Sequence, residues 1–400
     1  MSTFACPVVK IASVENHSGA DRLSIVKLEG LGYTCISGKL EDGSPRYKAG
    51  DWVVYIPTSS VLPEWLLKEM DFWNADTNKG TLAGRNGDRV KPLNLRGVFS
   101  EGVLLPVEWA PGAAGFGGEY VVYEWSTGVG EYLTVSLGDD VAEFLGITKW
   151  SPPIPVHMAG EVASLSESAF IYDFERWESV TDIFETGESV VANEKLHGSC
   201  LIIQYFPDLD HSEMFPDSAG YRSITISSKG LGSQGLVFKN NQANANNLYV
   251  QAFRTLMDEY DLSGLMHAMS KSNGGSQPVA ILGEVFGKNV QDLDYGTTKP
   301  TVRVFDMHIG RVWLTPDEFN FWGATLPLVP TLYRGPFDLS AIQAVRDGVT
   351  TVGGNHVREG VVVRSTDSND HPLHGRKIAK FISPAYMTRK VKNGEATEFN

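Results

Sequence analysis

The chain has 400 residues, too many for one ordinary hydrophobic core, and this length predicts two domains. Its hydrophobic fraction of 42% and charged fraction of 20% are typical of a folded soluble protein, and no apolar run is long enough to span a membrane. The start of the chain lacks the basic and apolar regions of a secretory signal. The three cysteines, Cys6, Cys35 and Cys200, lie far apart, which excludes a cysteine-built zinc site and indicates a reducing compartment.

The net charge of -14 argues against a uniformly basic nucleic-acid-binding surface. A local basic segment, Arg376 to Lys392, contains no acidic residue and can still contact a polynucleotide. The alternative interpretation is a solvated, charged helix end. We expect the protein to be a monomer and to have no membrane partner. We expect it in the cytoplasm, or in the host cytoplasm if a phage encodes it.

Residues 1–150 are predicted to be rich in β-structure. Short apolar or alternating runs are separated by clusters of Gly, Asp and Pro, at a spacing typical of a small closed barrel. An OB-like barrel is one candidate, and the pattern alone does not exclude other small barrels. The predicted strands are Val8 to Val14, Ser24 to Leu28, Tyr33 to Ser37, Trp52 to Ile56 and Gly102 to Pro106.

Residues 151–169 are predicted to be a linker, because prolines cluster after Trp150 and favour an extended chain. Residues 170–400 then alternate between strand and helix patterns, which predicts a mixed α/β domain and an α+β protein overall. The spacing of apolar residues predicts one helix over Leu248 to Met269. The predicted strands of this part are Ser189 to Ala192, Ser199 to Tyr205, Val279 to Val285, Val302 to Met307 and Gly360 to Arg364.

The turn from Glu194 to Ser199 carries the candidate chemistry. A lysine at a strand end, followed three residues later by glycine, is how nucleotidyltransferases present an amine to an α-phosphate. A free lysine has a pKa of about 10.4, so cations and desolvation must favour the reactive neutral form. The K-x-x-G pattern is unspecific by itself, and Lys195 is preferred because it lies between two apolar strands. The pattern occurs at Lys27–Gly30, Lys195–Gly198, Lys229–Gly232 and Lys271–Gly274.

Further motifs in the expected order make the region from Asp173 to Lys380 resemble the covalent nucleotidyltransferase superfamily of ligases and capping enzymes. The segments that resemble the superfamily motifs are Lys195 to Gly198, Thr225 to Gly230, Leu282 to Gly287, Val304 to Asp306, Glu359 to Arg364 and Arg376 to Phe381.

Within the superfamily, the chain is most similar to the Deinococcus-type RNA ligases, which join an N-terminal OB domain to a nucleotidyltransferase domain. His197 stands where many relatives have aspartate, and Leu282 to Gly287 resembles the RNA ligase form of its motif. Few residues follow Lys380, whereas DNA ligases and capping enzymes carry a further OB domain there. The resemblance is strongest from Glu188 to Ile382.

The resemblance implies an ATP-dependent ligase with RNA, an RNA/DNA hybrid or a nicked duplex as its partner, and with Mg or Mn as a cofactor. Lys195 would form AMP–lysine, and Glu284 and Glu359 would hold the metal directly or through water. Lys377 and Lys380 would contact the α-phosphate, although their spacing places them on opposite faces of a strand and favours Lys380. The expected nucleotide-binding residues are Glu194, Leu196, Gly198, Lys229, Glu284, Phe305 and Lys380.

Other interpretations of these residues stay open. Glu284 can pair with a basic neighbour, Phe305 can be part of the core, and His197 can be a structural hydrogen-bonding residue. His371 and His374 form a close pair with no third ligand nearby in the sequence, which favours a surface loop over a metal site. The alternative functions are a GTP-dependent capping guanylyltransferase and a non-catalytic nucleic-acid-binding protein of the same fold.

Overall fold

A computed structural model describes residues 4–110, 119–124, 131–150, 159–208, 223–272, 274–367 and 370–389. Residues 151–158 of the predicted linker lie outside these described residues, as do Lys390 and Lys392 of the predicted basic segment. The chain divides into two compact units. Most of the N-terminal unit is Ser2–Pro152, and most of the larger unit is Asp182–Tyr386.

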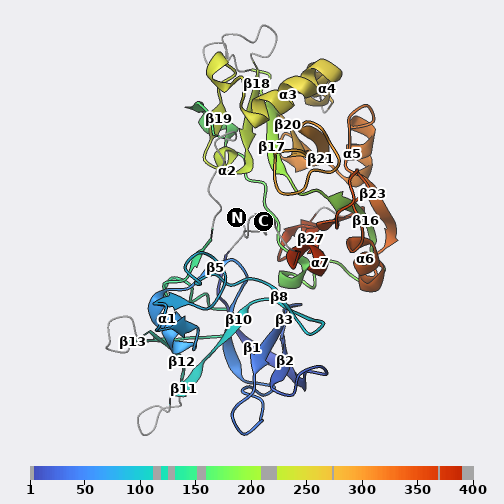
Figure 1. The fold of residues 1–400 in the computed structure, drawn as a ribbon. Coiled ribbons are helices and arrows are strands. Elements are labelled where there is room, and N and C mark those ends of the chain that lie inside the picture. Colours follow the sequence, from blue (N-terminus) through green and yellow to red (C-terminus); the bar gives the residue numbers. More distant parts are fainter. Residues whose placement is uncertain are drawn as a thin grey trace. The chain divides into compact units, whose positions relative to one another are not determined.

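A five-stranded antiparallel sheet forms the centre of the N-terminal unit, with strand order β10-β4-β1-β2-β3 (Figure 1). The Glu101 backbone N–H donates to the Thr34 carbonyl at 2.8 Å, so the edge strands β3 and β10 approach each other and nearly close a barrel. The strands are β1 (Val8–Asn16), β2 (Leu23–Leu28), β3 (Thr34–Gly38), β4 (Trp52–Ile56) and β10 (Val103–Pro106).

Strand β4 is apolar throughout because its two faces meet two different hydrophobic clusters. Val54 and Ile56 pack into one cluster, and Val53 and Tyr55 into the other. A three-stranded sheet follows the barrel in the chain, and its strands are β11 (Glu108–Ala110), β12 (Glu119–Glu124) and β13 (Glu131–Thr134). The unit also contains α1 (Glu64–Glu69) and the short paired strands β5 (Ser60–Val61), β14 (Thr148–Lys149), β6 (Trp73–Asn74), β7 (Lys79–Gly80), β8 (Leu93–Leu95) and β9 (Val98–Ser100).

Two antiparallel sheets form the larger unit. One has the order β18-β17-β20-β21-β22, with β18 (Ile224–Ser228), β17 (Ser199–Tyr205), β20 (Val279–Phe286), β21 (Thr301–Ile309) and β22 (Val312–Trp313). The other has the order β23-β16-β24-β27, with β23 (Thr331–Pro336), β16 (Ser189–Lys195), β24 (Gly360–Ser365) and β27 (Ile378–Ile382). Two further pairs are β15 (Val162–Ser164) with β19 (Leu236–Phe238), and β25 (Asp370–His371) with β26 (Gly375–Arg376).

The helices of the larger unit include two that cover the five-stranded sheet, α3 (Leu248–Glu259) and α4 (Leu262–Lys271) (Figure 1). Their apolar faces bury Phe253, Leu256 and Met266 in the same cluster as residues of β17 and β20. The remaining helices are α2 (Lys229–Gly232), α5 (Pro316–Trp322), α6 (Leu339–Arg346) and α7 (Pro384–Met387).

The single helix predicted over Leu248 to Met269 is wrong, because α3 and α4 are separate. Tyr260 is extended, with φ -136° and ψ 145°, and ends α3. The side chain of Asp261 then accepts a hydrogen bond from the Gly264 backbone N–H at 3.0 Å and caps the start of α4. Among the described residues, no helix has the length and apolar character needed to cross a membrane.

Candidate functional site

Lys195 is the last residue of β16, and residues 196–198 carry the chain from that sheet into β17 of the other sheet. Lys195 is paired with Gly360 across the β16–β24 ladder, so the neighbouring Glu359 is brought close to the lysine side chain. The Lys195 Nζ lies 2.6 Å from Glu359 Oε1, and the side chains are 19% and 3% exposed. A buried carboxylate therefore holds the candidate nucleophile in a defined position.

Gly198 is required by the close approach of this turn to β20. A Cβ atom at position 198 would lie 2.1 Å from the Val285 carbonyl oxygen and 3.0 Å from the Cγ of Glu284. No real side chain fits this space, so the turn must have glycine for steric reasons. The same approach places Glu284 beside the turn that carries Lys195.

Two further lysines contribute positive charge to this region. Lys380 lies on β27 and is 6% exposed. Burial and the charges of Lys229 and Lys195 together lower the pKa of Lys380 to about 7, against the opposing effects of Asp173 and Glu175. Lys229 is the first residue of α2, and its Nζ lies 3.1 Å from Asp173 Oδ1. A bound anion would compensate the positive charges of these two lysines.

The carboxylates present fit the requirements of a divalent metal ion. Glu359 Oε2 is buried and has no hydrogen-bond partner among the described residues, which is unusual for a charged oxygen. Glu284 is half-buried on β20, and its Cγ lies beside Gly198 in the turn that follows Lys195. Oxygen ligands of this kind suit Mg or Mn.

His197 is buried and fixed on every side. One ring nitrogen, Nε2, lies 2.7 Å from Asp292 Oδ1, and Nδ1 lies 2.8 Å from the Tyr386 hydroxyl. Its backbone N–H donates to the Tyr295 hydroxyl at 2.6 Å. These contacts favour the structural interpretation of His197, because both ring nitrogens already have protein partners.

The side chains on either side of Lys195 point away from it. Glu194 accepts hydrogen bonds from the Thr350 hydroxyl and the Thr351 backbone N–H, at 2.5 and 3.0 Å. Leu196 is 3% exposed and packs in an apolar cluster with Phe286 and other residues. Any contact of Glu194 or Leu196 with a nucleotide in this conformation would therefore have to come from the backbone.

Lys377 lies apart from the Lys195–Glu359 pair, whereas Phe305 packs against the apolar cluster that contains Leu196. Phe305 is half-buried, and its ring centroid is 5.4 Å from that of Tyr172. Lys377 Nζ lies 2.7 Å from the carboxylate of Glu188, next to the start of β16 rather than its Lys195 end. The structure thus brings together Lys195, Glu359, Glu284, Lys229 and Lys380, and it leaves Lys377 outside this group.

A buried ionic network in the larger unit was missed by sequence reasoning. Asp306 is fully buried, and its carboxylate accepts hydrogen bonds from Arg364, Arg376 and the Tyr172 hydroxyl. Burial opposes ionisation, but Arg376 and Arg364 overcome it and lower the pKa of Asp306. Three of these residues lie in the quoted motifs, yet only the fold shows that they pair.

Comparisons with known proteins find matches for both parts of the chain. Residues 188–382 match the RNA ligase family, and residues 5–107 match an OB-fold domain family. These matches confirm the predicted fold class, an N-terminal OB-fold domain followed by an RNA ligase domain. No curated protein matches the sequence.

Several solved structures of an RNA ligase from Naegleria gruberi have the same fold. The structure with pyrophosphate has a TM-score of 0.67 and 22% identity, and the match covers 97% of this chain and 98% of that one. A variant with AMP and Mn has a TM-score of 0.66 and 22% identity, covering 95% and 97%. A variant with ATP and Mn has a TM-score of 0.65 and 21% identity, covering 95% and 97%.

Proposed function

Because residues 188–382 match the model of the RNA ligase family, we propose that the protein joins RNA 3′-hydroxyl and 5′-phosphate ends in an ATP-dependent reaction. The observation that carries the proposal is the Lys195–Glu359 pair at the K-x-x-G turn, with Lys380 and Lys229 close by. In this reaction Lys195 attacks the α-phosphate of ATP, a phosphorus–nitrogen bond forms, and pyrophosphate leaves.

The protein's own residues support this first step. Lys195 must lose a proton before it attacks, and Glu359, at 2.6 Å, is positioned to accept it. Lys380 and Lys229 offer positive charge to the phosphates as negative charge shifts to the leaving group. A divalent metal ion held by Glu284 and Glu359 would neutralise phosphate charge, and the Naegleria structures with ATP or AMP and Mn support ATP and a divalent metal ion as cofactors.

The later steps transfer AMP to the RNA. A 5′-phosphate oxygen attacks the phosphorus of AMP–lysine and restores the free lysine. A 3′-hydroxyl then attacks the adenylylated end, forms the phosphodiester and releases AMP. Sealing of a nicked duplex during RNA repair is the biological role that we propose for this activity.

The N-terminal unit would hold the polynucleotide. It contains the OB-fold domain at residues 5–107, a fold that binds single strands through a groove and stacked aromatic rings. We therefore assign residues 1–150 to nucleic-acid binding and residues 170–400 to catalysis, joined by residues 151–169.

The cysteines are compatible with a cytoplasmic enzyme. Cys6, Cys35 and Cys200 form no disulfide. Burial raises the pKa of the Cys6 thiol to about 12, and it raises the pKa of Cys35 and Cys200 as well. Such thiols are poor nucleophiles, so we expect them to stay reduced and to take no part in the chemistry.

The deciding experiment measures label transfer to the protein. Purified chain is incubated with α-labelled ATP or GTP and Mg or Mn, and acid-stable label on the protein is counted. We expect labelling from ATP, and none in Lys195→Ala. Lys271→Ala is the matched control, because this K-x-x-G lysine lies at the end of α4, where its Nζ donates to the Ser276 hydroxyl, and the variant should label normally.

Other outcomes would redirect or remove the proposal. Label from GTP alone would favour a capping-type guanylyltransferase. Retained label in Lys195→Ala would place the nucleophile elsewhere. Absence of label in protein free of prebound AMP would favour a non-catalytic nucleic-acid-binding protein.

A further inference from the structure

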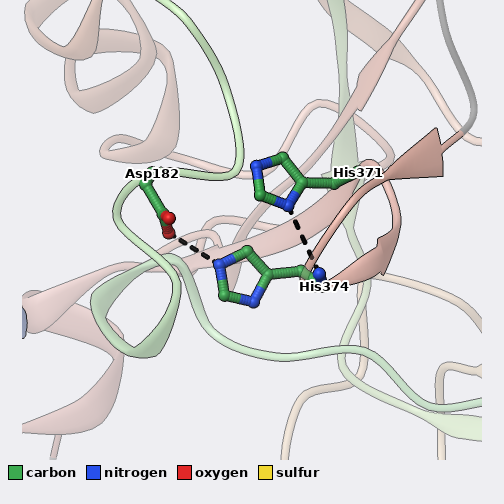
Figure 2. Close-up of side chains that lie close together, drawn as sticks. All are labelled: Asp182, His371 and His374. Atoms are coloured by element: carbon green, nitrogen blue, oxygen red, sulfur yellow. Dashed lines mark hydrogen bonds and ion pairs between the residues drawn. The ribbon is translucent and has the colours of Figure 1, made fainter.

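Asp182, His371 and His374 bring metal-ligating atoms together away from the site described above (Figure 2). One ligand atom from each residue lies within 4.8 Å of the other two. Asp182 is far from the histidines in the sequence, which is why the sequence alone showed only a histidine pair. The fold supplies the third ligand that the pair lacked.

The histidines are held by the hairpin of β25 and β26. His371 pairs with Gly375 across this short ladder, and its Nδ1 accepts long hydrogen bonds from the Leu373 and His374 backbone N–H groups, at 3.2 and 3.3 Å. The rings of His371 and His374 stack with centroids 4.7 Å apart and an angle of 17° between their planes. The tight turn therefore fixes two imidazoles side by side.

Asp182 is fixed by the residues that follow it. Ile183 and Phe184 are buried, and the Phe184 ring centroid is 5.1 Å from that of Phe337. The Asp182 carboxylate remains 62% exposed and lies 2.7 Å from His374 Nε2. An anchored backbone with an accessible carboxylate allows a small rotation toward an incoming ion.

We propose that Asp182, His371 and His374 bind a divalent transition-metal ion, with zinc as the best match. Two imidazoles and one carboxylate are a common donor set for zinc, whose bonds to such ligands are about 2.0–2.2 Å long. Coordination at this length needs the ligand atoms to move closer than their present separation, which side-chain rotation can provide. If His371 binds through Nε2, its proton moves to Nδ1, and the two long backbone contacts are lost. If His374 binds through Nε2, that nitrogen gives up its proton and its hydrogen bond to Asp182, and the carboxylate binds the ion instead.

This site lies at the opposite end of the sheet from Lys195. Lys195 pairs with Gly360 at one end of the β16–β24 ladder, and Val190 pairs with Ser365 at the other. The hairpin that carries the histidines connects β24 to β27 at the Ser365 end. The bound ion would tie this hairpin to the segment before β16, and thus cross-link three strands of the catalytic sheet. The inference does not depend on the proposed ligase activity.

The test is zinc binding by the full chain without nucleotide, measured by calorimetry after treatment with a chelator. We expect one zinc ion per chain. His371→Ala, His374→Ala and Asp182→Asn should each weaken binding at least tenfold, and zinc should raise the Tm of the wild type but not of His374→Ala. Cobalt serves as a second probe, because a tetrahedral site gives visible absorption.

Two control variants separate this site from others. Glu359→Gln removes a candidate ligand of the catalytic ion and should leave zinc binding unchanged. His267→Ala removes an exposed histidine of α4 that contacts Tyr205, and it should also bind normally. Absence of zinc binding by the wild type at about 100 µM, which is weak for any structural site, would overturn the proposal. Wild-type affinity in both His371→Ala and His374→Ala would also overturn it.

Discussion

Lys380 is a buried lysine, and the carboxylates that favour its charged form are Asp173 and Glu175. Burial, Lys229 and Lys195 lower its pKa from 10.5 to about 7, so its charged form destabilises the folded state. Between pH 7 and 10.5 the unfolded chain binds more protons at this residue, and its contribution to stability therefore rises with pH across that window.

We predict that Lys380→Met stabilises the free protein and abolishes labelling by ATP. Methionine fills the space without a buried charge, so the free energy of unfolding should rise by about 1–4 kcal/mol at pH 6.5. The gain should shrink as the pH approaches 10, because the wild-type lysine is then neutral. Thermal unfolding between pH 6.5 and 10 measures the gain, and a destabilised variant at pH 6.5 would contradict the argument.

Lys377→Met is the matched control and should change stability in the opposite direction. Lys377 is paired with Glu188, and the side chains are only 12% and 9% exposed. Its removal would leave a nearly buried carboxylate without its cation, at a cost of about 3–5 kcal/mol. Labelling by the folded fraction decides whether Lys377 also takes part in catalysis.

At the scale of single elements, the turn from β16 to β17 depends on the close contact between Gly198 and β20. We predict that Gly198→Ala lowers stability by about 1–3 kcal/mol, because its Cβ would lie 2.1 Å from the Val285 carbonyl oxygen and the turn must move. Labelling should fall with stability, because the same turn positions Lys195. Thermal unfolding and label transfer from ATP measure the two effects.

Gly275→Ala provides the comparison for this variant. A Cβ at Gly275 would meet nothing within 4 Å, and the φ of Gly275 lies outside the left-handed region. Its Tm and labelling should therefore stay close to those of the wild type. If both alanine variants behave alike, the close contact at Gly198 has no role in positioning the lysine.

Elements with sharp local signals could be predicted from the sequence. Trp52–Ile56 and Ser199–Tyr205 were predicted with the observed bounds, because turn residues enclose an apolar run. The break between α3 and α4 was missed because helical spacing continues across the Asp261 cap. Contacts between distant residues were beyond a sequence argument. Glu359 reaches Lys195 through the register of β16 and β24, and Asp182 reaches the histidines only through the fold.

At the scale of the whole molecule, the two units are expected to divide the work between RNA binding and adenylation. The N-terminal unit has a pocket between β4, β11 and β12, lined by Arg46 and several aromatic residues. The rings of Trp52 and Tyr120 stack at 3.9 Å, and Trp109 meets Tyr120 edge-on at 4.8 Å. Trp109 is 54% exposed, so its face is accessible to a nucleobase.

We predict that Trp109→Ala weakens binding of nicked RNA and slows sealing, while Lys195 is still labelled by ATP at the wild-type rate. Stacking of one base contributes about 1–3 kcal/mol to binding, and its loss reduces the affinity roughly 5- to 150-fold. Tyr132→Ala is the matched control, because this residue of β13 is 63% exposed and does not line the pocket. A fall in labelling by Trp109→Ala would mean that the division between the units fails, and equal sealing by both variants would remove the pocket from RNA binding. A selective sealing defect in Trp109→Ala would instead show that the pocket acts after lysine adenylation, because only the later steps require the polynucleotide.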